Sequence, residues 1–389
     1  QLAGGLAEAG CEVACAGIVP TPGIAELVLA LGAGAGISVS ASHNPFQDND
    51  IKIFGADGRK WPDAREETVE RALIASREED EERATGEGAA GETPRTDVSL
   101  AEEYLARLAA HVPARLGGVA ILVDAGNGAA HRLGPEALRR AGADVTAIFD
   151  RPDGRNINAE CGALHPAAMA EATRSRGAAL GVAFDGDADR SIFSDENGRV
   201  LDGDDVLWIV AREWKRSGRL PEGGVVGTVM SNFGLEAALT RERIAFRRAA
   251  VGDRHVARLM EETGAVLGGE TSGHVLLPFS PAGDGIQTTL LLADIVARSG
   301  GSLARLATLE KTPQQLRNVR VARRAPWEES PGIARAVRRA EDALDGRGRV
   351  YLRYSGTEPL LRILVEGPDA GEVQAIADDL EATVRNELT

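Results

Sequence analysis

Short apolar runs alternate with amphipathic stretches along most of the chain. In one example the apolar run Val119–Val123 is followed by helical spacing over Gly134–Ala141 and then by a second apolar run, Val145–Phe149. This alternation is typical of α/β domains with mostly parallel sheets, and three such blocks follow one another. The end of the chain has a different pattern, which predicts a smaller α+β module with an open sheet. Its expected elements are the strands Leu316–Val321, Val350–Arg353 and Leu361–Val365 and the helices Gly332–Leu344 and Ala370–Asn386.

Three breaks in this pattern divide the chain into four predicted domains. The stretch Ala75–Thr96 is acidic and poor in apolar residues, so we expect a frayed helix that leads into a linker. A second break lies at Asp202–Asp204, where a strand ends before a helix predicted over Asp205–Arg216. A third lies at Lys311–Pro313. The expected domains are residues 1–96, 97–203, 204–310 and 311–389.

A serine with phosphate-handling groups around it lies in the first domain. Ile37 and Val39 predict a short buried strand that ends in the loop Ala41–Pro45, so we expect Ser42 to face outward from a turn. Lys52 lies in the alternating segment Ile51–Phe54, which predicts a half-buried strand with the ammonium group on its polar face. Ser42 is therefore a candidate phosphorylation site with Lys52 as its acid, base or phosphate partner. The alternative is a loop serine beside a surface lysine.

Composition narrows the class of protein. The chain has 389 residues, 43% hydrophobic and 26% charged, as is ordinary for a globular protein of several domains. Its net charge of −15 argues against a nucleic-acid partner, so an anionic small substrate would have to meet local basic pockets. The three cysteines, Cys11, Cys15 and Cys161, fit neither a disulfide framework nor a zinc site and predict reduced thiols in the cytoplasm. No segment reads as a membrane span or a signal peptide.

The sequence DGDADR places three carboxylates on alternate positions after an apolar strand. Asp185, Asp187 and Asp189 follow the strand predicted over Ala179–Phe184, and such a density of hard oxygen ligands suits Mg²⁺. A calcium loop that ends at Glu196 is a weaker alternative, because Arg190 stands where that loop needs glycine. A solvated acidic turn is the other alternative, although three carboxylates this close repel one another without a cation.

Two further loops carry polar groups. Glu270 and Ser272 follow a strand predicted over Ala265–Leu267 and could bind vicinal hydroxyls, with His274 as a candidate general acid or base. The alternative is a simple turn with a surface histidine. The segment RYSGTEP offers an arginine, hydroxyls and free amides to a phosphate monoester, the alternative being a β-turn with an exposed arginine. The candidate phosphate ligands are Arg353, Ser355, Gly356, Thr357 and Arg362, with Arg254 as a further cation.

Taken together and in this order, SASHNP, DGDADR, GGETSGH and RYSGTEPLLR resemble the α-D-phosphohexomutase family, most closely its phosphoglucosamine mutases. The stretches VGDRHV, TVMSNFGLE, NINAECGALHP and LRNVRV are also similar to that branch. The resemblance implies four domains around a central cleft. It implies a cytoplasmic isomerase that interconverts glucosamine 6-phosphate and glucosamine 1-phosphate through a bisphosphorylated intermediate. Such an enzyme would supply UDP-N-acetylglucosamine and cell-wall precursors.

The resemblance also implies roles for individual residues. Ser42 would carry the phosphate, which would itself be a ligand of one Mg²⁺ ion held by Asp185, Asp187 and Asp189. Lys52, together with His43 or His274, would transfer protons, and Arg190 would steady the phosphoryl group. Glu270 and Ser272 would bind ring hydroxyls. The phosphate not being transferred would be held by Arg353, Ser355, Gly356, Thr357 and Arg362, and a catalytic hexose bisphosphate would prime the enzyme.

The chain departs from the family pattern in two places. Family members begin with a strand and an arginine loop that precede the position of Gln1, so we expect the first domain to be truncated and its sheet to lack a strand. Asp50 stands where the family usually has glycine. Other open functions are a phosphomannomutase or phosphoglucomutase, a simple phosphatase and a non-catalytic sugar-phosphate binder. We expect no membrane or nucleic-acid partner, and either a monomer or a homodimer.

Overall fold

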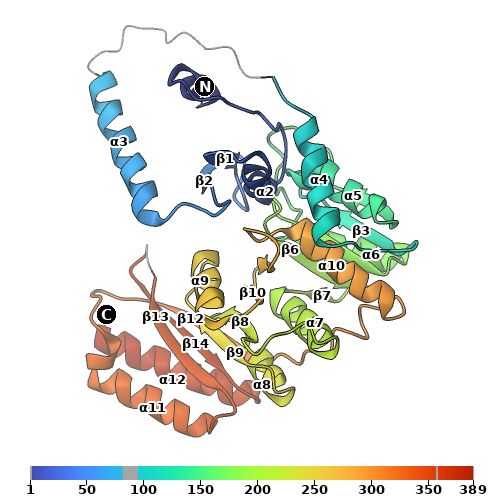
Figure 1. The fold of residues 1–389 in the computed structure, drawn as a ribbon. Coiled ribbons are helices and arrows are strands. Elements are labelled where there is room, and N and C mark those ends of the chain that lie inside the picture. The colour runs from blue at the N-terminus through green and yellow to red at the C-terminus, as the bar shows by residue number, and fades with distance from the viewer. Residues whose placement is uncertain (1, 82–94, 356–357, 389) are drawn as a thin grey trace. The chain divides into compact units, whose positions relative to one another are not determined.

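The computed structural model describes residues 2–81, 95–355 and 358–388 and contains helices and strands throughout (Figure 1). It divides into two compact units, one made of residues 1–228 and 249–307 and the other of residues 229–248 and 308–389. The predicted mixed α/β class is confirmed. The domain boundaries expected from the sequence remain a prediction.

The first unit contains helices and strands in alternation. Its helices are α1 (Leu2–Glu8), α2 (Thr21–Leu31), α3 (Asp63–Glu81), α4 (Ser99–His111), α5 (Ala130–Arg140), α6 (Ala167–Arg176), α7 (Gly203–Arg216), α9 (Asp253–Thr263) and α10 (Gly285–Arg298). Its strands are β1 (Ala35–Ser40), β2 (Asp50–Gly55), β3 (Ala120–Asp124), β4 (Asp144–Ile148), β5 (Leu180–Phe184), β6 (Ser191–Asp195), β7 (Val200–Leu201), β8 (Val225–Thr228), β10 (Leu267–Gly269) and β11 (Val275–Leu276).

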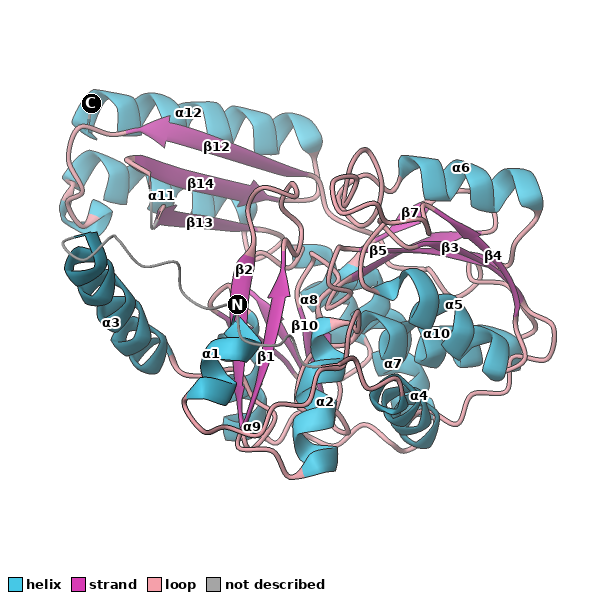
Figure 2. Ribbon diagram, turned by 90° about the horizontal axis from the view of Figure 1, so that it is seen from above, coloured by secondary structure: helices cyan, strands magenta, loops and turns pink. Residues whose placement is uncertain are grey.

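A five-stranded sheet of order β4-β3-β5-β6-β7 forms the centre of the first unit. Strands β4, β3 and β5 are parallel, whereas β6 and β7 are antiparallel to their neighbours. Helix α6 covers one face, and α5 and α10 cover the other (Figure 2). Every residue of β5 and β6 is buried, and the full burial of β5 explains why it is a continuous apolar run in the sequence. The loop between these two strands therefore starts from a rigid support.

The antiparallel pair β1–β2 corrects one expectation from the sequence. Val39 and Ile51 are paired and exposed, at 59% and 57%, whereas Ser38 and its partner Lys52 lie on the inward side. The expected orientation is inverted, because Phe54, which shares the face of Lys52, is the residue buried against α2. The apolar residues predicted to be buried thus face outward, and the lysine predicted to lie on a solvent-facing side faces inward.

Strand β10 is parallel to β8 and antiparallel to β11. It begins at Leu267, two residues later than the sequence predicted, so Gly268 and Gly269 belong to the strand rather than to a flexible loop. The reason is packing against α9: a Cβ atom on Gly268 would lie 2.5 Å from the sulfur of Met260. Glycine here lets α9 approach the sheet closely.

The second unit contains α8 (Phe233–Arg241), β9 (Phe246–Ala249), β12 (Gln314–Arg320), the 3₁₀ turn η1 (Trp327–Glu329), α11 (Pro331–Leu344), β13 (Arg349–Tyr354), β14 (Leu360–Glu366) and α12 (Ala370–Leu388). Strands β12, β14 and β13 form an antiparallel sheet in that order, packed against α11 and α12. The apolar core between them includes Ile333, Ile363 and Leu380, as the predicted α+β module requires.

Among the described residues no helix is both long enough and apolar enough to cross a membrane. Cys11, Cys15 and Cys161 are not joined in disulfides.

A buried carboxylate starts helix α10. Asp284 accepts hydrogen bonds from the backbone N–H of Gln287 at 3.0 Å and from the hydroxyl of Tyr104 at 2.7 Å. Burial raises the pKa of Asp284 to about 6 in spite of these bonds. Because this exceeds the usual aspartate value of about 4, the folded protein binds the proton more tightly than the unfolded chain does. Stability from this group is therefore full at low pH and is lost as the pH rises through about 6.

Asn at position 284 keeps the capping oxygen but cannot titrate. We therefore expect Asp284→Asn to shift the free energy of unfolding, relative to the parent protein, in the stabilising direction by about 2 kcal/mol between pH 4.5 and pH 7. Urea unfolding at the two pH values measures this shift. Asp144→Asn, at an exposed position, controls for the loss of one negative charge. An equal effect of Asp284→Asn at both pH values would contradict the prediction.

Candidate active site

Ser42 lies in the turn that follows β1 and is held by its backbone. Its φ of 50° is left-handed, a conformation that costs a residue other than glycine about 1–2 kcal/mol. Its carbonyl oxygen accepts hydrogen bonds from the backbone N–H of Gly186 at 2.9 Å and from the side-chain amide of Asn158 at 2.8 Å. Ser42 is only 3% exposed, so the expectation that it faces outward is wrong. The loop after β5 covers it, and a Cβ atom on Gly186 would lie 2.4 Å from the Ser42 carbonyl oxygen.

The ammonium group of Lys52 joins Ser42 to the acidic loop. Its Nζ lies 3.4 Å from the hydroxyl oxygen of Ser42, 2.5 Å from Oδ2 of Asp187 and 3.2 Å from Oδ2 of Asp189. Burial by itself lowers the pKa of Lys52, but the carboxylates of Asp189 and Asp187 outweigh burial, so the pKa lies above its ordinary value. Lys52 is therefore positively charged at neutral pH, and it donates a hydrogen bond to the serine hydroxyl.

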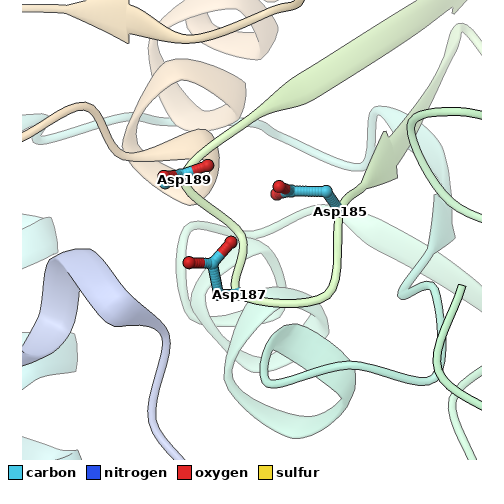
Figure 3. A group of neighbouring side chains, drawn as sticks. All are labelled: Asp185, Asp187 and Asp189. Atoms are coloured by element: carbon cyan, nitrogen blue, oxygen red, sulfur yellow. The ribbon is translucent and has the colours of Figure 1, made fainter. Parts of the chain in front are cut away.

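Asp185, Asp187 and Asp189 form a buried group on the loop between β5 and β6 (Figure 3). One carboxylate oxygen from each lies within 4.8 Å of the others. Asp185 Oδ2, Asp187 Oδ1 and Asp189 Oδ1 are buried acceptors without a hydrogen-bond partner among the described residues. Burial and the carboxylates of Asp189 and Asp187 raise the pKa of Asp185. A buried set of unsatisfied acceptors with surplus negative charge fits a hard divalent cation.

The structure argues against both alternatives to this metal site. The three aspartates are buried, so they are not a solvated acidic turn. Glu196, which would close a calcium loop, is separated from them by the whole of β6. Its carboxylate accepts hydrogen bonds from the hydroxyl of Ser302 at 2.5 Å and from the backbone of Ala304 at 3.0 Å.

His274 lies between two carboxylates. Its Nδ1 is 3.8 Å from Asp189 Oδ2, and its Nε2 is 3.8 Å from Asp253 Oδ2. Asp253 also accepts a hydrogen bond from the ammonium group of Lys60 at 2.5 Å. Burial raises the pKa of Asp189, but the neighbouring imidazole of His274 and the charge of Lys52 more than offset this, so the pKa is lowered. His274 is 3% exposed, which excludes the simple surface histidine weighed from the sequence.

Arg190 and His43 border the same group. The backbone N–H of Arg190 donates to Asp185 Oδ1 at 3.1 Å, and its side-chain Nε lies 3.7 Å from Asp189 Oδ1. His43 follows the serine directly, and burial together with the positive charge of Arg190 lowers its pKa. The structure thus brings Ser42, Lys52 and these two residues to one place beside the aspartates.

The predicted sugar-binding residues Glu270 and Ser272 differ from each other in burial. Glu270 is half-buried and accepts the backbone N–H of Gly252 at 2.8 Å, and Ser272 is exposed. Arg254 forms ion pairs with Asp63 and, at 2.6 Å, with Glu66, so in this structure its partners are carboxylates. Glu270 and Asp253 therefore place the loop Gly268–His274 beside the segment that follows β9.

The predicted phosphate ligands lie in the second unit. Arg353 and Arg362 are directly opposite each other in the pairing of β13 with β14 and line a cavity of about 20 Å³ with Leu316 and Tyr351. Like charges facing each other across a sheet repel, so this pair suits an anion. The Arg362 guanidinium also lies 3.5 Å from the hydroxyl of Ser355. The remaining expected ligands, Gly356 and Thr357, lie outside the described residues.

Sequence reasoning missed Asp253 and Lys60. Asp253 lies within VGDRHV, a stretch whose arginine is the only residue that the sequence singles out for a site, and Lys60 belongs to no motif. Only the fold brings Lys60, at the end of the β2 turn, to a carboxylate that faces His274.

Family models match almost the whole chain and identify its family. Models of the phosphoglucomutase/phosphomannomutase alpha/beta/alpha domains I, II and III match residues 1–80, 102–198 and 202–312, and the C-terminal domain model matches residues 316–383. The chain belongs to the phosphoglucomutase/phosphomannomutase family. The predicted phosphohexomutase resemblance is confirmed, and the chain is an isomerase.

Individual relatives agree with this family. A phosphoglucosamine mutase of Symbiobacterium thermophilum is 45% identical over 100% of this chain and 86% of its own length. A phosphoglucomutase/phosphomannomutase family protein of Burkholderia thailandensis has a TM-score of 0.77 at 25% identity, covering 99% of this chain and 85% of its own. The N-acetylphosphoglucosamine mutase of Aspergillus fumigatus, solved with GlcNAc-6P and magnesium, has a TM-score of 0.66 at 19% identity. That match covers 97% of this chain and 96% of its own, and it shares the fold.

The aspartate group makes a binding prediction. Asp187→Asn removes one charge from the cation site, so we expect Mg²⁺ to bind at least about tenfold more weakly than to the parent protein. Because the pKa of Asp185 is raised, Mg²⁺ binding to the parent should release protons and weaken as the pH falls. Isothermal titration calorimetry in buffers of different ionisation enthalpy measures both quantities. Asp195→Asn, a buried carboxylate on β6 outside the group, is the matched control. Unchanged affinity in Asp187→Asn would rule out this cation site.

Proposed function

We propose that the chain interconverts glucosamine 6-phosphate and glucosamine 1-phosphate by way of a phosphorylated Ser42. The choice of sugar is supported by relatives that are phosphoglucosamine mutases and align with the chain along its whole length. The phosphoserine chemistry is supported chiefly by one observation, the hydroxyl of Ser42 3.4 Å from a buried ammonium beside three carboxylates.

In the proposed cycle the enzyme starts with a phosphate on Ser42. The sugar hydroxyl attacks that phosphorus, the bond to the serine oxygen breaks, and a sugar bisphosphate forms. Lys52 donates a proton to the departing serine oxygen, a role that its position 3.4 Å from that oxygen supports. The attacking hydroxyl loses its proton to His274 or His43. After the bisphosphate turns round, its other phosphoryl group returns to Ser42 by the same steps reversed.

The groups around the serine would stabilise the negative charge of the transferring phosphoryl group. Asp185, Asp187 and Asp189 would hold one Mg²⁺ ion, which supplies electrostatic stabilisation of the transferring phosphoryl group. Arg190 offers a second positive charge from the same loop. Lys52 compensates part of the carboxylate charge. A catalytic hexose bisphosphate would restore the phosphate of any enzyme that loses it.

Two sets of residues are proposed for substrate recognition. Glu270 and Ser272 would bind ring hydroxyls, with Arg254 as an additional cation in the same unit. Arg353, Ser355 and Arg362, together with Gly356 and Thr357, would bind the phosphate that is not being transferred. The product would feed UDP-N-acetylglucosamine and cell-wall precursors. The free cysteines suit a reducing compartment such as the cytoplasm.

Removing the nucleophile tests the proposal. We expect Ser42→Ala to abolish isomerisation of glucosamine 6-phosphate in the presence of Mg²⁺ and glucose 1,6-bisphosphate, and to abolish incorporation of ³²P from the bisphosphate. Ser175→Ala, at an exposed serine on α6, is the control for incorporation. Turnover by Ser42→Ala would overturn the phosphoserine assignment.

Side-by-side assays of the parent protein with glucosamine, glucose and mannose phosphates test the substrate. Faster turnover of glucose or mannose phosphates than of glucosamine phosphates would change the assigned substrate but not the proposed phosphoserine chemistry. Release of free phosphate faster than isomerisation would indicate a phosphatase, and no turnover with any sugar would favour a non-catalytic binder.

The pair Arg353 and Arg362 leads to a prediction about phosphate binding. Arg353→Lys keeps the charge but loses the planar fork that binds two phosphate oxygens. We expect KM for the sugar monophosphate to rise by about tenfold or more, because this site holds the same phosphate in the ground state and the transition state. Arg347→Lys, at an exposed position of the same unit, is the control. Initial-rate kinetics over a range of substrate concentrations decide the outcome, and an unchanged KM would place phosphate binding elsewhere.

A further inference from the structure

The segment Gly154–Ala163 contains none of the catalytic or binding residues proposed above, yet Asn158 within it contacts the serine loop directly. The side-chain Nδ2 of Asn158 donates to two carbonyl oxygens at once, that of Ser42 at 2.8 Å and that of Asn44 at 2.9 Å. The loop between them is closed on itself, because the backbone N–H of Asn44 donates to the Ala41 carbonyl at 2.8 Å. One amide group thus fixes both ends of the peptide segment that carries the serine.

Asn158 is itself held rigidly. Its φ is 57°, and its backbone N–H donates to the carbonyl of Gly126 at 2.9 Å. Beneath it, the buried carboxylate of Asp124 accepts the backbone N–H groups of Gly126 at 2.8 Å and Gly162 at 2.9 Å. Asp124 ends strand β3, so the amide of Asn158 is anchored to the central sheet.

The chemistry required here selects asparagine. Contact with two carbonyls needs two N–H donors on one short side chain, which an aspartate or a serine cannot supply. The left-handed backbone at position 158 also favours asparagine, aspartate or glycine over other residues. No other side chain meets both requirements at this length.

We propose that Asn158 is a positioning residue for the phosphoryl transfer, acting through the backbone of Ser42. It holds the serine in its left-handed conformation from one side while Gly186 of the acidic loop holds the same carbonyl from the other. The serine oxygen is thereby kept in place relative to Lys52 and the aspartates. The inference rests on the proposed role of Ser42 as the phosphorylated residue.

Two substitutions test this role without straining the backbone. Asn158→Asp keeps the size and the tolerance of positive φ but replaces both donors by acceptors, and Asn158→Gly removes the side chain altogether. We expect kcat for glucosamine 6-phosphate to fall about 10- to 100-fold in both, since small displacements of a reacting atom have effects of this size. KM should stay within about threefold of the parent value, because no substrate-binding residue is touched.

A control and a second readout separate positioning from folding. Asn156→Asp changes a neighbour in the same segment whose Nδ2 donates only to the Arg151 carbonyl, and it should keep kcat within about threefold of the parent. Rapid-quench measurement of phosphoryl transfer from ³²P-labelled Ser42 to glucosamine 6-phosphate should show the slowed step directly. Mg²⁺ affinity should match the parent in every variant.

The outcomes are distinguishable from failure of the proposed function. If both Asn158 variants keep parental kcat while Ser42→Ala is inactive, the inference is overturned and the function stands. A rise in KM with unchanged kcat, or loss of folding in both variants, would also overturn it by assigning Asn158 to binding or to stability. Turnover by Ser42→Ala would instead remove the proposed function itself.

Discussion

The buried ammonium of Lys52 is the interaction on which the site depends. An ammonium inside a protein is costly unless carboxylates compensate it, and Asp187 and Asp189 do so at 2.5 Å and 3.2 Å. The same contact fixes the acidic loop against β2 and brings the charge to the Ser42 hydroxyl. Three carboxylates against one ammonium leave negative charge in excess, which a divalent cation balances. Charge balance therefore links the serine, the lysine and the cation site into one unit.

Backbone geometry supplies the second constraint. The carbonyl of Ser42 is where three segments far apart in the sequence meet: the turn after β1, the loop after β5 and the segment that contains Asn158. A left-handed serine is strained, so these contacts are what keep it in place. Phosphoryl transfer consists largely of positioning and electrostatic stabilisation, and a serine held by its backbone leaves its hydroxyl free for chemistry.

Several features of the site could be read from the sequence, because they are local. The three aspartates alternate after an apolar run, and the strand predicted before them is observed as β5. The helices and strands of the C-terminal module also lie within a few residues of their predicted positions. The orientation of β1 and β2 was predicted wrongly, since apolar alternation says which residues share a face but not which face is covered.

The sequence by itself determined the family and the mixed α/β class and supplied the candidates for the reactive groups, because these depend on short motifs and on periodicity. Tertiary structure alone decided that Ser42 is buried and that Lys52 points inward. It also decided that Asp253 lies next to His274 and is paired with Lys60. Only the tertiary structure showed that Asn158 forms a hydrogen bond with Ser42, which is 116 residues away in the sequence. The physical reason is the same in each case: burial and long-range hydrogen bonds depend on which segments pack together, and no local pattern of side chains records that choice.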